Sequence, residues 1–390
     1  MTATRMVQAM GAFFKGTWKR HQATLGLICW AVFDCRRLQL SEVGRHLDTS
    51  SLPKHAIKRV DRWLGNGRFD DRRAREQFAR VVIGPRRRLL IAIDWTKLRR
   101  WPVLVAGVVY RGRAIPILWS VADPSKLYKS QNAFEHGFFT WLSDVLPEGV
   151  EATVLMDRGF KRVAIVQVLK RCKLNFVIRT GGNVHVKSDS YNGRIDNWIQ
   201  RRGQKRVIRN AILRPSRPVT VHIVGLWVKG CKEPWLLMTD LPNTIDSVAA
   251  LYAKRFRIEE TFRDQKDWRF GLQLGHTLIR KPQRVERWLL VAALVLFFAL
   301  LIGGHARRRG FDRALRANTV NRPTHSDFTL GLYYARRIVE SAITDRNPSL
   351  ISTRGSSKNE GIPQPNPLLP PGLLGTIVVL GSGDVELAGP

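Results

Sequence analysis

Cysteine is scarce in this chain of 390 residues: there are four, and no two of them have CxxC spacing. This excludes a zinc ribbon and the dense disulfide framework of a small secreted protein, so we expect reduced, mostly buried thiols. Long apolar runs are also missing. The longest, residues 289–302, is shorter than the roughly 18 residues of a membrane span and is interpreted as a buried core helix. The first residues lack the apolar segment and cleavage site of a signal peptide. These absences favour a cytoplasmic protein with no membrane partner.

Acidic residues are few as well, with 31 Asp and Glu against 65 Lys and Arg and a formal net charge of +34. Such an excess predicts a polyanionic partner, because neutralised phosphates release their counterions. The basic residues are spread along the chain rather than gathered on one amphipathic helix, which favours nucleic acid over lipid. With 44% hydrophobic residues, the chain can bury a sizeable core in two or three structural units.

Residues 252–266 carry the most informative pattern in the chain. At about 100° of rotation per residue, Tyr252, Arg255, Glu259 and Lys266 fall on one face of a helix, beside an apolar stripe that can pack on a core. A phenol, a guanidinium, a carboxylate and an ammonium in line suit a phosphate backbone held beside a metal ion. The alternative is a solvated helix face with ordinary Arg/Glu pairs.

The spacing resembles the signature of one branch of the DDE transposases of bacterial insertion sequences. Two residues separate Tyr252 from Arg255, three separate Arg255 from Glu259, and six separate Glu259 from Lys266, as in the Tyr-Arg-Glu-Lys (YREK) motif of that branch. The resemblance implies that Glu259 is the last of three metal-binding carboxylates. It also implies two aspartates upstream, each at the end of a buried strand.

Two aspartates have this position. Asp94 ends an apolar run that follows the basic residues 86–88, and Asp157 ends the run that begins after residue 151. Each alone could be a strand-end cap, but clustered carboxylates on rigid strands are what a two-metal site requires. The segment DRGF around Asp157 resembles the one that carries the second aspartate in this family. Together with a hairpin over residues 101–121 and a helix over 132–146, these strands predict an α/β, ribonuclease-H-like sheet.

The stretch between Asp157 and Glu259 is far longer than a ribonuclease-H crossover requires. Residues 181–240 alternate β-branched and turn residues and predict an inserted β-domain, which the resemblance also implies at this point. Within it, Trp235 stands where the family places an aromatic that receives a base flipped from the DNA end. Trp227 is the other candidate, and a buried strand tryptophan is the ordinary explanation for either.

The first 80 residues read as helical and basic. A short helix followed by a second one from residue 53 resembles a helix-turn-helix, whose second helix enters the major groove. The outer face of that helix carries Lys54, Lys58, Arg59 and Arg62, which are candidate DNA-binding residues. A solvated basic face is the alternative.

From these patterns we predict a helical DNA-binding region, a split catalytic core with an insertion, and a tail rich in Pro, Gly and Ser. The expected parts are a DNA-end-binding domain (1–80), the first part of the core (86–180), the inserted β-domain (181–240), the second part of the core with C-terminal helices (241–346), and a flexible tail (347–390).

The resemblance implies a nucleoid-associated DNA transposase that cuts and joins the ends of an insertion sequence. Asp94, Asp157 and Glu259 would bind two Mg²⁺ ions, with Mn²⁺ as a possible substitute, while Tyr252, Arg255 and Lys266 hold phosphates and Trp235 assists a hairpin intermediate. The expected partners are double-stranded DNA, both terminal inverted repeats and target, and a second copy of the chain in a homodimer. Two rivals stay open, namely a nuclease on the same fold without strand transfer and a domesticated, inactive DNA-binding regulator.

Overall fold

The computed structural model describes residues 2–344, apart from 197, 214–217, 229 and 270, with the backbone alone for residues 336–344. The chain divides into two compact units. Unit 1 comprises Met1–Pro85 and Arg263–Pro390, and unit 2 comprises Arg86–Phe262. The predicted tail, 347–390, lies outside the described residues. Unit 2 is an interruption of unit 1 in sequence, so the chain leaves the helical unit and returns to it.

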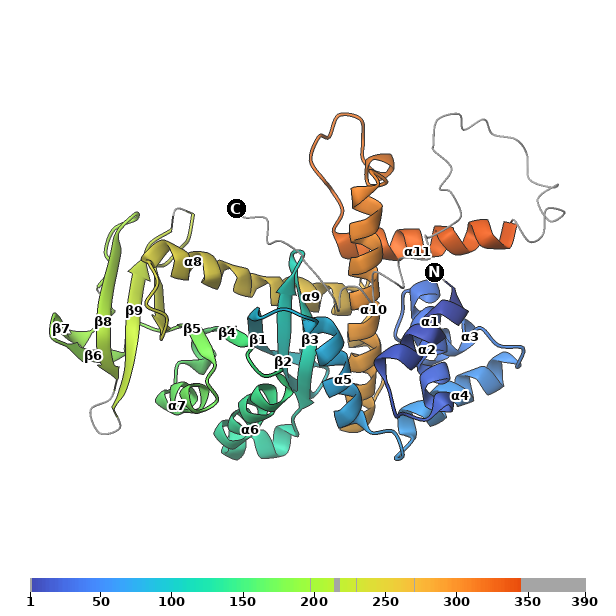
Figure 1. Cartoon of the computed structure of the whole chain (residues 1–390), viewed down its shortest axis with the longest axis horizontal. Coiled ribbons are helices and arrows are strands. Elements are labelled where there is room, and N and C mark those ends of the chain that lie inside the picture. The colour runs from blue at the N-terminus through green and yellow to red at the C-terminus, as the bar shows by residue number, and fades with distance from the viewer. Residues whose placement is uncertain (1, 197, 214–217, 229, 270, 345–390) are drawn as a thin grey trace. The chain divides into compact units, whose positions relative to one another are not determined.

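Unit 2 is built on one mixed sheet of ten described strands, in the order β3-β2-β1-β4-β5-β10-β9-β8-β6-β7 (Figure 1). Their bounds are β1 Arg88–Leu98, β2 Trp101–Tyr110, β3 Arg113–Val121, β4 Glu151–Met156, β5 Asn175–Arg179, β6 His185–Ser188, β7 Tyr191–Arg194, β8 Lys205–Leu213, β9 Val219–Leu226 and β10 Trp235–Thr239. The helices that accompany the sheet are α6 Pro124–Val145, α7 Val163–Arg171 and α8 Ile245–Ala253, with the short 3₁₀ turns η1 Arg158–Phe160 and η2 Lys254–Phe256.

The first five strands form a ribonuclease-H-like core. Antiparallel pairing joins β1 to β2 and β2 to β3, and parallel pairing joins β1 to β4 and β4 to β5. The predicted hairpin is present, and its turn has positive φ at Arg111 (45°) and Gly112 (77°), which matches the twist of the flanking strands. The order 3-2-1-4-5 with these directions confirms the predicted fold class.

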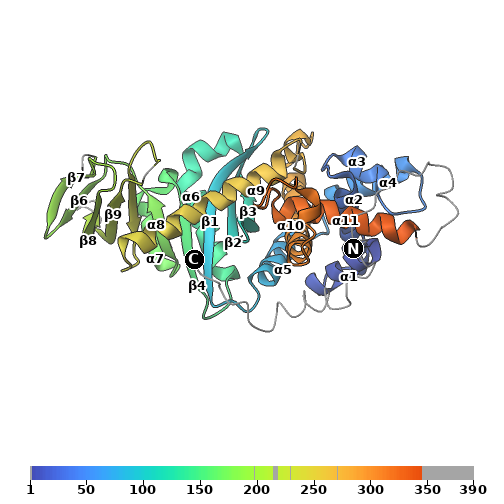
Figure 2. The same cartoon turned by 90° about the horizontal axis from the view of Figure 1, so that it is seen from above.

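Helices lie on both faces of this core. Trp95 of β1 contacts α6, whereas Leu90 of the same strand packs into the apolar cluster of α8 residues Val248, Ala249 and Tyr252. Because successive strand side chains point to opposite faces, odd-numbered residues of β1 face α6 and even-numbered ones face α8. Figure 2 shows α8 running across the strands.

The insertion continues the core sheet. Strand β10 pairs antiparallel with β5, with Leu237 opposite Arg179, and β9, β8, β6 and β7 follow outward. The strands expected in residues 181–240 are therefore part of the same sheet, so side chains on β10 lie close to the core.

Helix α6 begins earlier than the sequence predicts. The sequence predicts a start at residue 132, but the helix starts at Pro124. Asp123 caps the helix by accepting a hydrogen bond from Ser125 N at 3.0 Å. Proline in the first turn costs no hydrogen bond, which explains why a segment that reads as a loop joins the helix.

Unit 1 is helical. Its helices are α1 Ala3–Phe13, α2 Lys19–Cys35, α3 Leu40–Arg45, α4 Pro53–Gly65, α5 Asp71–Ile83, α10 Pro282–Arg308 and α11 Asp327–Thr344, with 3₁₀ turns η3 Leu274–His276 and η4 Arg313–Leu315. Helix α9, Arg257–Lys266, begins in unit 2 and ends in unit 1.

Helix α10 is the core of unit 1. Its Phe298 ring stacks on Phe13 of α1 at 5.7 Å, and a Cβ on Gly303 would lie 1.7 Å from Asp327 O, so α11 crosses in close contact. By length and composition α10 is apolar enough to cross a membrane, but 89% of its apolar window is buried inside the structure. This is the burial of a core helix, as the sequence predicts.

Candidate active site

Asp94 and Asp157 come together at neighbouring strands. The parallel register pairs Ala92 with Leu155 and Ile93 with Met156, so the next residues along the two strands are the two aspartates. Leu155 belongs to the apolar cluster under α8, and Asp157 lies two residues further on the same face. The register and the alternation of side chains therefore place both carboxylates on the α8 face of the sheet.

Asp157 also caps the turn that follows it. Its Oδ1 accepts a hydrogen bond from Gly159 N at 2.9 Å, and a Cβ at Gly159 would lie 3.0 Å from that oxygen. The turn η1 then buries Phe160, whose ring lies 6.4 Å from Phe139 of α6. The carboxylate that ends the strand is thus held by the turn after it.

The third carboxylate lies on a helix that is not continuous. The sequence predicts a single helix over 252–266, but the 3₁₀ turn η2 at Lys254–Phe256 separates α8 from α9. The tighter turn brings Tyr252 and Arg255 inward, and they are only 1% and 6% exposed. Glu259, in the first turn of α9, keeps an exposed side chain. The expected polar stripe is therefore buried at one end.

Arg255 joins two of the three carboxylates. Its Nη2 donates to Glu259 Oε1 at 2.6 Å, its Nη1 lies 3.4 Å from Asp94 Oδ2, and its buried Nε has no hydrogen-bond partner. Burial lowers the pKa of Arg255, but the charges and hydrogen bonds of Tyr252, Glu259 and Asp94 outweigh burial and raise it. The guanidinium therefore stays charged and supplies the positive charge that the carboxylates need.

The single positive charge of Arg255 does not neutralise the negative charges of the three carboxylates. Burial, reinforced by the charges of Asp157 and Glu259, raises the pKa of Asp94 to about 6, although Arg255 acts in the opposite direction. The ionised form of Asp94 is thus destabilised at neutral pH, and an additional cation would stabilise it. Asp94 is affected by both other acids, so the three carboxylates form one electrostatic group.

The oxygen atoms of Asp94, Asp157 and Glu259 are suitable donors for a divalent metal ion. Among the residues that the structure describes, no three His, Cys, Asp or Glu side chains stand in a ready metal-binding group. The donors are nevertheless all carboxylate oxygens, which Mg²⁺ and Mn²⁺ prefer, and Arg255 already bridges two of them as a cation. Asp94, Asp157 and Glu259 are therefore the residues that could hold such an ion.

An aromatic cluster lies beside the carboxylates. The Trp235 ring is partly buried and meets Tyr252 edge-on at 5.0 Å, while Phe256 contacts both rings and is 39% exposed. Arg255 stacks over Phe256 at 4.5 Å. Phe256 is not among the residues predicted from the sequence, and its position directly after Arg255 is the only signal that marks it. The other candidate, Trp227, uses its indole nitrogen to donate to Cys231 O at 3.1 Å.

Two sets of predicted residues lie elsewhere in the chain. Lys266 is the last residue of α9 and belongs to unit 1. The helix pair α3 and α4, also in unit 1, packs closely, since a Cβ at Gly44 would lie 2.5 Å from Ile57 Cα. On α4 the side chains of Lys54, Lys58 and Arg62 are exposed, whereas Arg59 is half-buried and donates to Thr24 Oγ1 at 3.3 Å. Three of the four predicted basic residues are thus available to a ligand.

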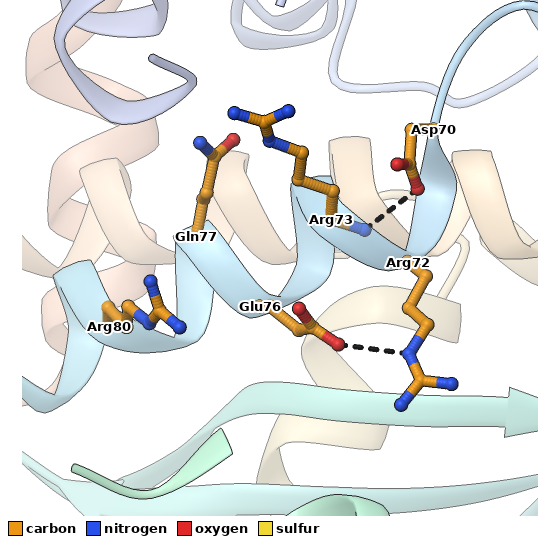
Figure 3. A pocket seen from close by; sticks show the side chains of 6 residues that line it. All are labelled: Asp70, Arg72, Arg73, Glu76, Gln77 and Arg80. Carbon is orange, nitrogen blue, oxygen red and sulfur yellow. Dashed lines mark hydrogen bonds and ion pairs between the residues drawn. The ribbon is translucent and has the colours of Figure 1, made fainter. Parts of the chain in front are cut away.

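A second basic surface, not predicted from the sequence, lies along α5 in unit 1. A hollow there has a volume of about 380 Å³. Its lining side chains, shown in Figure 3, are Asp70, Arg72, Arg73, Glu76, Gln77 and Arg80. Arg72 Nε donates to Glu76 Oε1 at 3.0 Å, and Gln77 Nε2 donates to Lys15 O at 2.6 Å. The hollow contains three arginines against two acids, and one of these acids is paired with Arg72.

A family model described as a transposase DDE domain matches residues 86–298. The match covers more than half of the chain, begins just before β1 and takes in Asp94, Asp157 and Glu259. No curated protein matches the chain.

Proposed function

Because the chain belongs to the DDE transposase family, we propose that it cuts and joins the ends of an insertion sequence by metal-assisted phosphoryl transfer. Members of this family bind DNA, are enzymes of the nuclease type and generally use divalent metals. The observation that carries the proposal is that Arg255 joins Glu259 to Asp94, while the strand register places Asp157 beside Asp94. We also propose the YREK branch, on the spacing of Tyr252, Arg255, Glu259 and Lys266.

Asp94, Asp157 and Glu259 are the proposed metal ligands. Two Mg²⁺ ions, or Mn²⁺, when bound would supply activation of a water or 3′-hydroxyl and neutralisation of the leaving oxygen. The carboxylates come from rigid elements, which keeps their oxygens at a fixed separation. No covalent protein–DNA intermediate is required, so no nucleophilic side chain is assigned.

The neighbouring residues act on the DNA. Arg255 holds Asp94 and Glu259 together in the absence of substrate and has the fork geometry to bind a phosphate. Burial raises the pKa of Tyr252, so its hydroxyl stays protonated and can donate to a phosphate oxygen. Lys266 is a further phosphate ligand by its place in the motif. Trp235, with the exposed ring of Phe256 beside it, would stack on a flipped base during hairpin formation.

The helical unit would recognise the DNA ends. Helices α3 and α4 form a close pair, and Lys54, Lys58 and Arg62 on the exposed face of α4 suit double-stranded DNA, with Arg59 held at its side. The net charge of +34 supports binding to both repeat and target DNA. We further propose a homodimer on DNA, a nucleoid-associated location and the five-part division of the chain predicted from the sequence.

The role of Glu259 separates this proposal from a DNA-binding regulator. Glu259→Gln removes one metal ligand without removing the DNA-binding face of α4, so we expect cleavage to fall by at least about 100-fold while specific binding is retained. End-labelled repeat DNA in Mg²⁺ measures cleavage, and a gel-shift titration measures binding. Cleavage at the wild-type rate would contradict the assignment of Glu259, and a wild type that binds but does not cut would favour the regulator.

A further inference from the structure

A buried carboxylate on α6 lies outside the proposed metal-binding set. Glu135 is 0% exposed. Its Oε1 accepts hydrogen bonds from Trp95 Nε1 and Gln131 Nε2, both at 2.9 Å, and its Oε2 accepts one from Arg162 Nη2. A charge without solvent is costly even when it is paired, and an apolar side chain of similar size often replaces such a pair without loss of stability. Its presence therefore calls for a role beyond stability.

Two of its donors come from the chain segments that carry Asp94 and Asp157. Trp95 follows Asp94 directly in β1 and points to the opposite face of the sheet, toward α6. Arg162 comes directly after the turn that Asp157 caps. One carboxylate thus ties the end of β1 and the turn after β4 to a single helix.

Aromatic contacts support both connections. The Trp95 ring stacks on Phe134 at 5.6 Å, and the Phe160 ring lies 6.4 Å from Phe139. These contacts set the distance between the strands and α6, but they do not fix the rotation of each segment about its axis. The directional hydrogen bonds to Glu135 do fix it, because indole and guanidinium donors tolerate little misalignment.

Glu135 is not itself arranged as a metal ligand. Both of its oxygens accept hydrogen bonds from side-chain donors. It lies on the α6 face, whereas Asp94 points to the α8 face.

We propose that Glu135 is a positioning residue that holds the Asp94 and Asp157 segments at the separation that metal binding needs, through Trp95 and Arg162. The inference rests on the proposed function, since it assigns Glu135 a role in that same site. In the variant Glu135→Gln, an amide N–H₂ group must face either Trp95 or Arg162, both of which are donors, so one of the two connections is lost.

The test is Mn²⁺ binding to the full-length protein without DNA, measured from the electron paramagnetic resonance signal of free Mn²⁺. We expect Glu135→Gln to weaken Mn²⁺ affinity by about 10-fold or more, as loss of a hydrogen bond to a ligand-bearing segment typically does. In the double variant Glu135→Gln/Arg162→Gln, the fold-loss of Mn²⁺ affinity should be smaller than the product of the fold-losses in the two single variants. The reason is that the second change removes the guanidinium that Glu135→Gln leaves unpaired. Trp95→Phe removes only the indole donor and should also weaken Mn²⁺ affinity. It replaces Glu135→Gln in the test if that variant does not fold.

The matched control is Leu142→Ala on the same helix, a fully buried residue without a hydrogen bond to either segment. It should lower the melting temperature but change Mn²⁺ affinity less than about twofold, because it leaves the connections of Glu135 intact. Equal affinity in the wild type, Glu135→Gln and Trp95→Phe, with loss only in Asp157→Asn, would overturn the inference and leave the proposed function standing. Absence of Mn²⁺ binding that depends on Asp157 in the wild type would overturn both.

Discussion

Arg255 decides the electrostatics of the site at the scale of single residues. It is nearly buried, it pairs with Glu259 and approaches Asp94, and its Nε has no partner. A buried arginine that leaves one donor unused and serves two acids is not an optimal structural ion pair. This arrangement is consistent with the proposed role, in which Arg255 binds a phosphate and leaves the carboxylates to a metal ion when substrate binds.

Asp94 should make the metal-free protein less stable at neutral pH. Its pKa is raised from 3.8 to about 6, so the stability that the protonated form contributes is fully present below pH 4 and is lost as pH rises through 6. Asp94→Asn should therefore raise the free energy of unfolding at pH 8 by roughly 1 to 3 kcal/mol, and by much less at pH 4. Urea denaturation at both pH values measures this. An equal difference at pH 4 and pH 8 would contradict the pKa shift.

Replacement of Trp235 tests the proposed hairpin step. In the Trp235→Ala variant the carboxylates and Arg255 are unchanged, so first-strand cleavage should persist, while the hairpin yield should fall about tenfold because a stacking surface worth roughly 1 to 3 kcal/mol per base is lost. Denaturing gels of end-labelled DNA separate nicked from hairpin product. Trp227→Phe is the matched control, and it should keep the wild-type yield. A normal hairpin yield in Trp235→Ala would return Trp235 to an ordinary packing role.

At the scale of elements, α10 organises the helical unit through polar as well as apolar contacts. Arg287 is 4% exposed; it donates to Trp63 O at 3.1 Å and to Leu64 O at 2.8 Å, and its Nε and Nη2 bind the two Asp71 oxygens at 2.8 and 2.9 Å. It therefore satisfies carbonyls at the C-terminal end of α4 and pairs with the first turn of α5. Arg287 thus helps to orient α4, the proposed DNA-binding helix.

Arg287→Met should destabilise the helical unit by about 3 to 5 kcal/mol, because it leaves a half-buried carboxylate and two helix-end carbonyls without a partner. Circular dichroism melts of the full chain measure the loss. The neighbouring Arg284→Met is the matched control. Its partner Asp61 has a side chain that is 42% exposed, so the change should cost less than about 1 kcal/mol. Similar losses in both variants would refute the capping role of Arg287.

The elements also show what the sequence can and cannot reveal. Apolar runs that end in aspartate and the hairpin at 101–121 follow from local periodicity and turn residues, and each is present. The early start of α6 depends on the Asp123 cap and on Pro124. An Asp-Pro pair is equally typical of a loop, so the sequence does not mark this start. The 3₁₀ turn at Lys254–Phe256 follows from packing against β1, and no residue type marks it.

Contacts between residues that are far apart in the chain could not be predicted from the sequence. Glu135 reads as an ordinary polar residue of an amphipathic helix, and only the fold brings it to Trp95 and Arg162. The burial of Glu135 could not be predicted, because Arg162, the residue with which it is paired, lies 27 residues further along the chain.

At the scale of the whole molecule, the chain combines a helical unit with an α/β unit that contains Asp94, Asp157 and Glu259. The net charge of +34 predicts tight but salt-sensitive binding to DNA, with affinity falling steeply as counterions are added. Binding alone would therefore not distinguish the enzyme from a regulator. Metal-dependent cleavage that requires Asp94, Asp157 and Glu259 would distinguish them, because a regulator binds DNA without cutting it.

The most direct test of the central claim is cleavage of end-labelled DNA that carries the flanking inverted repeats, with and without Mg²⁺, by the wild type and by Asp157→Asn. The account predicts cuts at the repeat boundary that require Mg²⁺ and vanish in the variant, with specific binding unchanged. Specific binding by the wild type without any metal-dependent cut, or cutting that survives in Asp157→Asn, would contradict it.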